Sequence, residues 1–113
     1  MKELPEAGIY DHTLVFLGYR HQYICEGVSM NPTLRDGEAV LVDRRAAVEV
    51  GDIVVAKHPI EQRSEIVKRV ASISERGHYF LVGDNLEDSN DSRHFGAVTR
   101  EYIRGKVVAR LKD

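Results

Sequence analysis

A serine and a lysine that lie 39 residues apart are the side chains of this chain best suited to joint chemistry. Ser29 lies in EGVSMNPTLRDG (26–37), between Val28 and Met30 and just before a proline turn. Its hydroxyl fits either a buried group that bonds to the backbone or a nucleophile. A serine hydroxyl becomes a good nucleophile only when a neighbouring base takes its proton, and a neutral lysine such as Lys68 can be that base without a histidine.

Lys68 lies in EIVKRVAS (65–72), a segment that reads as a strand. Side chains alternate along a strand, so Ile66, Lys68 and Val70 share one face. If that face is buried, the ammonium is poorly solvated and its pKa falls; a shift from ~10.4 to near 7 costs about 4.6 kcal/mol. Because Val67 makes the other face partly apolar too, three interpretations remain open: a catalytic amine, a solvent-facing lysine and a buried ion pair.

Seven segments are short, rich in Val, Ile and Tyr, and bounded by turn residues, which is typical of strands. They are TLVFLG (13–18), RHQYICE (20–26), AVLVDR (39–44), GDIVVAKH (51–58), SEIVKRVASI (64–73), HYFLVGD (78–84) and GKVVARLK (105–112). The pattern predicts an all-β domain whose antiparallel sheet positions the two side chains. Gly77 can supply the positive φ of a hairpin turn between 65–74 and 78–82. Thr99 can cap a helical turn over REYI (100–103), although a loop fits nearly as well.

Length and composition indicate the domain organisation. At 113 residues and 42% apolar content, the chain fits one domain, which buries about two-thirds of its unfolded surface. We expect an N-terminal segment (1–13) that can stay loose until it docks on a partner, followed by the domain proper (14–113). The 16 basic and 18 acidic residues are mixed along the chain and give a net charge of −2, so nucleic acid is not an expected partner.

Signals for a compartment or a cofactor are sparse. Cys25 is the single cysteine, so no internal disulfide can form and a reducing compartment fits. The longest apolar run near the N-terminus, LVFLG (14–18), is far shorter than the ~20 residues of a membrane span. We therefore expect that the chain is neither inserted into a membrane nor exported. The histidines have no metal-binding spacing, and DNLEDSND (84–91) lacks the glycine and the closing glutamate of an EF-hand, so we expect no metal and no other cofactor.

Four segments, in chain order, resemble the type I signal peptidase family, whose members are serine/lysine endopeptidases that remove leader peptides. They are GVSMNPTL (27–34), GDIVV (51–55), VKRV (67–70) and VGDNLEDSNDSRHFG (82–96). The resemblance covers roughly residues 26–111. In the last segment these residues fall at the family's spacing: Gly83, Asp84, Asn85, Ser89, Asp91, Ser92, Arg93 and Gly96. The resemblance implies the β-sheet or partly open barrel of the family's catalytic core, without the large inserted β-domain.

The resemblance also implies roles for the two reactive side chains. Ser29 matches the nucleophile, Lys68 matches the general base, and Ser89 matches the serine whose hydroxyl orients the lysine amine. The backbone N–H of Ser29 is the expected oxyanion donor. Gly27 stands where some members of the family carry a second, hydroxyl donor.

Four further positions match residues that support the site in the resembling family. Asp91 and Arg93 match an acid and base pair that holds the active-site framework. Met30 and Pro32 match positions that shape the turn around the nucleophile. Because Asp91 and Arg93 lie two residues apart, a plain structural ion pair is also the simplest interpretation of the two residues on their own.

A compact chain without a membrane anchor or an inserted domain narrows the expected substrate. This form is similar to the proteases that mature nickel-type superoxide dismutase. The similarity implies a cytoplasmic peptidase that removes the N-terminal propeptide of a nickel superoxide dismutase precursor. The nickel would belong to that partner, not to this chain.

Three alternatives stand beside that expectation. A leader peptidase that acts with a membrane partner would have the same fold. A non-catalytic module that grips an extended peptide along a sheet edge would have it too, although Ser29, Lys68 and Ser89 together argue against that module. The related self-cleaving repressors also use a serine/lysine pair, but the 28 residues before Ser29 leave no room for their DNA-binding domain.

Overall fold

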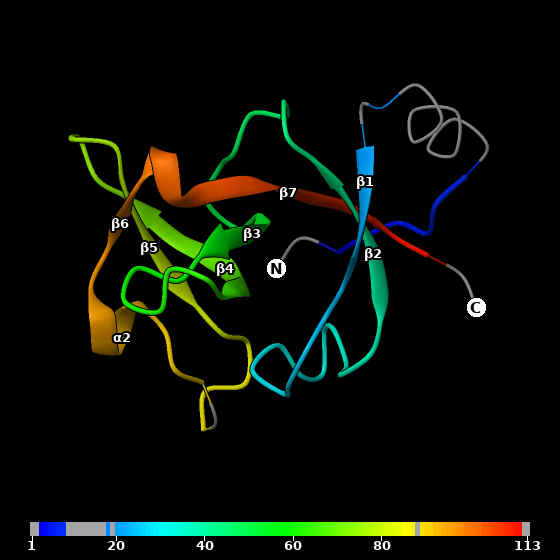
Figure 1. Ribbon diagram of the computed structural model, residues 1–113, viewed down its shortest axis with the longest axis horizontal. Helices are drawn as coiled ribbons and strands as arrows, with labels where there is room; N and C mark the ends of the chain where they lie inside the picture. The colour runs from blue at the N-terminus through cyan, green and yellow to red at the C-terminus, as the bar shows by residue number, and fades with distance from the viewer. Residues whose placement is uncertain (1–2, 9–17, 19, 88, 112–113) are drawn as a thin grey trace.

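A curved antiparallel sheet dominates the computed structural model, which describes residues 3–8, 18, 20–87 and 89–111 (Figure 1). In the described chain the sheet has seven strands in the order β1-β2-β7-β3-β4-β5-β6 and forms a half-barrel. The strands are β1 (Arg20–Ile24), β2 (Ala39–Asp43), β3 (Ile53–Lys57), β4 (Glu65–Ile73), β5 (His78–Val82), β6 (Val98–Thr99) and β7 (Ile103–Arg110). The prediction of an all-β fold is confirmed.

The predicted strands after residue 19 lie within two residues of the observed bounds. The segment 13–18, apart from Gly18, lies outside the described residues. The predicted hairpin is present as β4 and β5: Gly77 has a φ of 77°, and its N–H donates to the Ser74 carbonyl at 2.9 Å. Short runs rich in Val, Ile and Tyr between turn residues therefore sufficed to place the strands, because these side chains pack well in a buried sheet.

Two short helical elements flank β6 in the described residues: α2 (Ser92–Phe95) and η1 (Arg100–Tyr102). The turn predicted after Thr99 is present as η1, but the Thr99 hydroxyl donates to the Glu101 carboxylate at 2.9 Å instead of capping the helix. Neither α2 nor β6 was predicted, because elements this short show no periodicity. Among the described residues, no helix has the length and apolar character that crossing a membrane requires.

β7, the last strand of the described chain, lies between β2 and β3, which follow one another in the sequence (Figure 1). It pairs with β2 along one edge and with β3 along the other, with a register shift on each side. The β1–β2 hairpin therefore meets the β3–β6 part of the sheet through β7. Since Ser29 follows β1 and Lys68 lies in β4, the two parts carry one reactive side chain each.

Residues 3–8 lie beside the end of β7. Glu6 forms a parallel bridge with Arg110; the Ala7 N–H donates to the Arg110 carbonyl at 2.7 Å, and the Arg110 N–H donates to the Pro5 carbonyl at 2.8 Å. These residues belong to the N-terminal segment (1–13), of which residues 1–2 and 9–13 lie outside the described part of the chain.

Most of the buried apolar side chains form two clusters, one on each face of the central strands. The first cluster contains Cys25, Met30, Leu34, Val40, Val42, Ile53, Val55, Val67 and Val107. The second contains Val54, Ala56, Val70, Leu81, Val98 and Ile103. Consecutive residues of β3 alternate between the clusters, as strand geometry requires. A strand buried on both faces leaves its polar residues no exposed side, which governs the environment of Lys68 and Arg69 in β4.

Candidate active site

Ser29 and Lys68 line the same open groove, whose volume is about 420 Å³. Ser29 comes from the turn that follows β1, and Lys68 from the middle of β4. The remaining lining comes from residues 26–28 before Ser29, from the connection between β3 and β4, from Ile66 of β4 and from Asn90 before α2. The fold therefore brings together the serine and the lysine that were paired from the sequence.

Consecutive turns over residues 27–34 present Ser29 to the groove. Met30 and Leu34 are buried and anchor these turns in the first core cluster, and the Leu34 N–H donates to the Met30 carbonyl at 3.0 Å. Pro32 is exposed and follows a cis peptide bond. Among the described residues, neither the Ser29 hydroxyl nor its backbone N–H has a hydrogen-bond partner, so both are available to a ligand.

The segment after β5 holds the Ser29 turn in place. The Asn85 N–H donates to the Ser29 carbonyl at 2.8 Å, and the Asn85 side-chain amide donates to the Val28 carbonyl at 3.1 Å. Gly83 lies beside the Ser29 backbone with no side chain to separate the two segments. The position of the nucleophile candidate is thus set by residues more than fifty positions away in the sequence.

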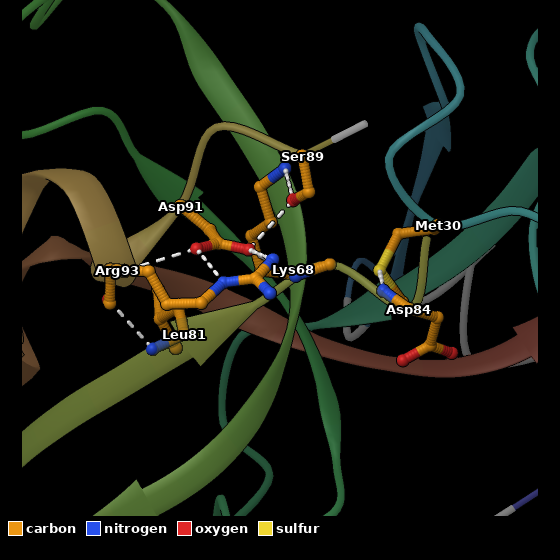
Figure 2. A network of polar contacts seen from close by, with 9 residues as sticks. Met30, Lys68, Leu81, Asp84, Ser89, Asp91 and Arg93 are labelled. Atoms are coloured by element: carbon orange, nitrogen blue, oxygen red, sulfur yellow. Dashed lines mark hydrogen bonds and ion pairs between the residues drawn. The ribbon is translucent and has the colours of Figure 1, made fainter. Parts of the chain in front are cut away.

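Asp84 ties the same segment to β4. Its N–H donates to the Met30 sulfur at 3.4 Å (Figure 2), and its carboxylate accepts from the Thr33 hydroxyl at 2.5 Å. Arg69 donates to both Asp84 oxygens, at 3.0 and 2.7 Å, and to the Gly51 carbonyl at 2.8 Å. Burial alone would raise the pKa of Asp84, but the hydrogen bonds from Arg69 and Thr33 lower it. The resulting ion pair is almost fully buried.

No role was predicted for this network from the sequence, although Asp84 and Asn85 fall in the matched segment. Its one sequence signal is the Lys68-Arg69 pair in an apolar strand. Adjacent side chains of a strand point to opposite faces, so a strand buried on both sides needs a partner for a cation on each face. The identity of the partner for Arg69 depends on a contact across 15 positions, which no local pattern encodes.

Lys68 is buried, with 4% of its surface exposed, between the second core cluster and the groove. Its ammonium nitrogen Nζ donates to the Ser89 hydroxyl oxygen at 3.3 Å (Figure 2). Burial lowers the pKa of Lys68; the Asp91 carboxylate opposes this change and the Arg93 guanidinium adds to it. Of the three interpretations left open by the strand pattern, the solvent-facing lysine is excluded.

Asp91 is fully buried and accepts hydrogen bonds from three residues (Figure 2). Its donors are the Gly83 N–H at 2.9 Å, the Ser89 hydroxyl at 2.8 Å, and the N–H, Nε and Nη2 groups of Arg93 at 3.1, 2.9 and 2.6 Å. Burial alone would raise the pKa of Asp91, but these hydrogen bonds hold it well below its usual range. The carboxylate is therefore ionised at neutral pH and can only accept hydrogen bonds.

The ionised state of Asp91 determines how the protons of its neighbours are arranged. Since Asp91 can only accept, Ser89 must donate its single hydroxyl proton to it. The Ser89 oxygen then has only lone pairs to offer Lys68, so the amine must donate to Ser89. A neutral amine that donates in this direction keeps its own lone pair for another proton donor in the groove that it shares with Ser29.

The carboxylates of this region bind basic side chains of the protein itself. In the part of the chain that the structure describes, no three His, Cys, Asp or Glu side chains gather as metal ligands. Within the acidic segment 84–91, Asp84 is bound to Arg69 and Asp91 to Arg93. These two carboxylates serve the protein's own cations and hydroxyl groups.

Comparison with known proteins gives a consistent family. The family model described as signal peptidase, peptidase S26, matches residues 9–75 and 72–112. Mitochondrial inner membrane protease subunit 1 of Xenopus tropicalis is 33% identical over 141 residues, covering 91% of this chain and 84% of the relative. The human protein of the same name is 28% identical, with 92% and 86% covered. Signal peptidase I of Streptococcus pneumoniae is 35% identical over 89 residues, with 78% and 39% covered.

These relatives confirm the family resemblance and correct one expectation. The predicted cytoplasmic location is wrong, because four relatives that match between 78% and 92% of this chain are named as subunits of a mitochondrial inner membrane protease. The expectation arose from the lack of an apolar span in the sequence, which does not exclude association with a membrane through a partner. The relatives named here also give no support to the dismutase precursor as substrate. The chain belongs to the signal peptidase family, peptidase S26, and is a serine endopeptidase.

Proposed function

We propose that this protein removes N-terminal leader peptides from precursor proteins at a membrane, together with a membrane-associated partner subunit. The observation that carries the proposal is the hydrogen-bonded chain Lys68–Ser89–Asp91, which ends in the groove that also holds Ser29. The names of the relatives support both the leader-peptidase activity and a place in a protease complex of a membrane.

Ser29 is the nucleophile in this proposal and Lys68 is the general base. The Ser29 Oγ attacks the scissile carbonyl carbon while the neutral Lys68 amine takes the hydroxyl proton. The carbonyl oxygen becomes an oxyanion, which the Ser29 N–H can stabilise because it has no partner among the described residues. When the C–N bond breaks, the Lys68 ammonium returns the proton to the leaving amine.

The second half of the reaction regenerates the enzyme. A water molecule gives a proton to Lys68 and attacks the acyl group on Ser29, and the ester bond then breaks as Lys68 returns that proton to the serine oxygen. Ser89 and Asp91 orient the amine through both halves, since the Ser89 oxygen accepts an N–H of Lys68 and so directs the nitrogen lone pair elsewhere. Arg93 is partly exposed and balances the charge of Asp91, at the end of the hydrogen-bonded series Lys68–Ser89–Asp91.

The substrate class follows from the groove and the family. An extended peptide can lie in an open groove of this size, and in the resembling family small residues precede the cut. The hypothesis that the substrate is a nickel superoxide dismutase precursor rests only on the compact form of this chain. It therefore enters the test as one of two precursors rather than as the expected substrate.

The test is a cleavage assay with two precursors: a membrane-protein precursor with a leader peptide, and a nickel superoxide dismutase precursor. Each is incubated with wild-type protein, Ser29→Ala or Lys68→Met, and the products are analysed by mass spectrometry. We expect cleavage of the leader precursor by the wild-type protein alone. Cleavage by Ser29→Ala would refute the mechanism, and peptide binding without cleavage by any protein would favour the non-catalytic module.

A further inference from the structure

The connection between β3 and β4 forms a second segment of the groove lining. Residues 58–64 have no strand or helix, yet His58, Glu61 and Ser64 of this connection line the groove together with Ser29 and Lys68. Two backbone hydrogen bonds close its base: the His58 N–H donates to the Ser64 carbonyl at 2.9 Å, and the Ser64 N–H donates to the Glu61 carbonyl at 2.8 Å. The first half of the connection needs other contacts to hold its path.

The imidazole of His58 supplies those contacts. Its Nδ1 accepts from the Ile60 N–H at 3.1 Å and from the Glu61 N–H at 3.0 Å. A nitrogen that accepts two N–H groups carries no proton, so the ring is neutral with its proton on Nε2. One side-chain atom thus fixes the backbone from residue 58 to residue 61, in the way that Asn and Asp side chains fix turns.

The same ring also connects the β3–β4 connection to α2. His58 packs against Phe95 with ring centroids 5.1 Å apart and planes at 61°, an edge-to-face arrangement. Phe95 ends α2 and packs against the second core cluster, and Asp91 caps the start of α2. The Ser92 hydroxyl accepts the Leu81 N–H at 2.8 Å and holds α2 to β5. His58 therefore joins the groove lining to the helix that follows the Lys68–Ser89–Asp91 chain.

We propose that His58 is a positioning residue that holds the β3–β4 connection in the shape that binds the substrate peptide, and so determines substrate affinity and selectivity. The proposal rests on the proposed function, in which the groove takes the peptide. His58 does not act as the base, although it lies in the groove with a serine. Its Nδ1 lone pair is engaged by two backbone N–H groups, and Nε2 carries the remaining proton, so no nitrogen is left to accept a proton from Ser29.

Three variants of His58 distinguish the effect of its hydrogen-bond acceptor from the effect of its aromatic ring. His58→Asn keeps an acceptor, because its Oδ1 can receive the N–H groups two and three residues on. His58→Phe keeps an aromatic ring for Phe95 but has no acceptor, and His58→Ala has neither. His78→Phe, at an exposed position of β5, serves as the matched control. The substrate probe is a fluorogenic peptide with alanine at the first and third positions before the scissile bond.

KM and kcat are measured separately for each variant, because a positioning residue should change KM more than kcat. Loss of the two hydrogen bonds in His58→Phe is expected to raise KM about tenfold with kcat within about twofold, and His58→Asn to keep KM within about threefold of the wild type. His58→Phe is also expected to reduce the preference for alanine over bulkier residues before the cut. A fall in kcat with unchanged KM in His58→Phe, or equal effects of His58→Asn and His58→Phe on KM, would overturn the proposal.

Hydrogen exchange of the Ile60 and Glu61 amides tests the positioning role without any substrate. Exchange should quicken at these two amides in His58→Phe and His58→Ala and stay near wild-type rates in His58→Asn. Unchanged exchange in His58→Phe would refute the role whether or not the protein cleaves peptides. Peptides left intact by the wild-type protein, with exchange as expected, would refute the proposed function and the effect on affinity, leaving only the structural contact.

Discussion

A β-carbon on Gly83 would lie 2.5 Å from the carbonyl oxygen of Ser29. It would also lie 2.1 Å from the Ser89 hydroxyl oxygen. Side-chain carbons are essentially never found so close to other atoms. The absence of a side chain at position 83 therefore allows the nucleophile candidate and the serine that bonds Lys68 to approach one another.

Substitution of Gly83 is expected to damage activity more than folding. In Gly83→Ala the added methyl group must push the Ser29 turn away from Ser89, which costs about 1–3 kcal/mol of unfolding free energy as overpacking. The displacement should lower kcat/KM about a hundredfold, because catalysis depends on sub-ångström placement. Gly8→Ala is the control, since a β-carbon there meets nothing within 4 Å. Equal effects of the two substitutions on kcat/KM would contradict the role of the close approach.

The lowered pKa of Lys68 predicts how activity depends on pH. Only the neutral amine can take the Ser29 proton, and the fraction of neutral amine rises as pH rises through the pKa of the free enzyme. Accordingly, kcat/KM should increase with pH and level off above that pKa, which burial places below the ordinary lysine value. The measurement is kcat/KM for the peptide probe between pH 5 and about 9. A flat profile over that range would exclude a lysine base.

Lys68→Met should be inactive yet more stable than the wild type near neutral pH. A folded-state pKa below the unfolded value means that the unfolded chain holds the Lys68 proton more tightly, so protonation favours unfolding. This penalty is present at pH values below the folded pKa and disappears as pH rises toward the unfolded value of ~10.4. Urea unfolding at several pH values should show the advantage of Lys68→Met shrinking toward pH ~10. Lys57→Met, at the less buried end of β3, controls for the general effect of removing a lysine.

Asp91 should contribute stability that is lost in acid. Its folded pKa lies below the ordinary value, so the contribution is present above about pH 3.9 and disappears as pH falls through the folded pKa. Asp91→Asn leaves its buried donors poorly satisfied, and the loss of charged hydrogen bonds should cost about 3 kcal/mol at neutral pH. Denaturant unfolding across acidic pH measures the effect. A difference between wild type and Asp91→Asn that persists undiminished near pH ~2 would contradict the assigned ionisation.

Ser89→Ala removes the acceptor that orients the Lys68 amine. Without it the lone pair has no fixed direction, so kcat is expected to fall about 10- to 100-fold, whereas KM for the peptide should change little. Ser72→Ala is the control, because Ser72 is an exposed serine of β4, the strand that carries Lys68. A change confined to KM would place Ser89 in substrate binding and remove it from the proton-transfer machinery.

The fold was predictable from sequence to the extent that its signals are local. Strand periodicity put Ile66, Lys68 and Val70 on one face, and the structure agrees, since Ile66 and Val70 both belong to or pack on the second cluster. The burial of that face was not predictable, because Val67 and Arg69 on the other face are buried as well. A strand with two buried faces shows no apolar-to-polar alternation to read.

The candidate site was predictable from motif resemblance more than from physics. The positions of Ser29, Lys68, Ser89 and Asp91 came from spacing within matched segments. The network of Arg69 with Asp84 and the contacts of His58 were missed, because they form only after β4, β5 and α2 have packed. Such contacts leave no periodic or compositional trace in the sequence.

β7 lies in the middle of the sheet but is synthesised after the other strands, so the sheet cannot be completed before the end of β7 is made. A nascent polypeptide that has emerged as far as Gly96 already contains the serine, the lysine and the groups that would orient it. It still lacks β7, the strand that pairs with β2 on one edge and with β3 on the other. Without that strand the serine turn and the amine can be held together only by side-chain packing and by the contacts of Asp84 and Asn85, not by a continuous sheet. Until β7 has been made, the sheet is divided between β2 and β3, and the groove has only part of the framework that holds its two reactive side chains.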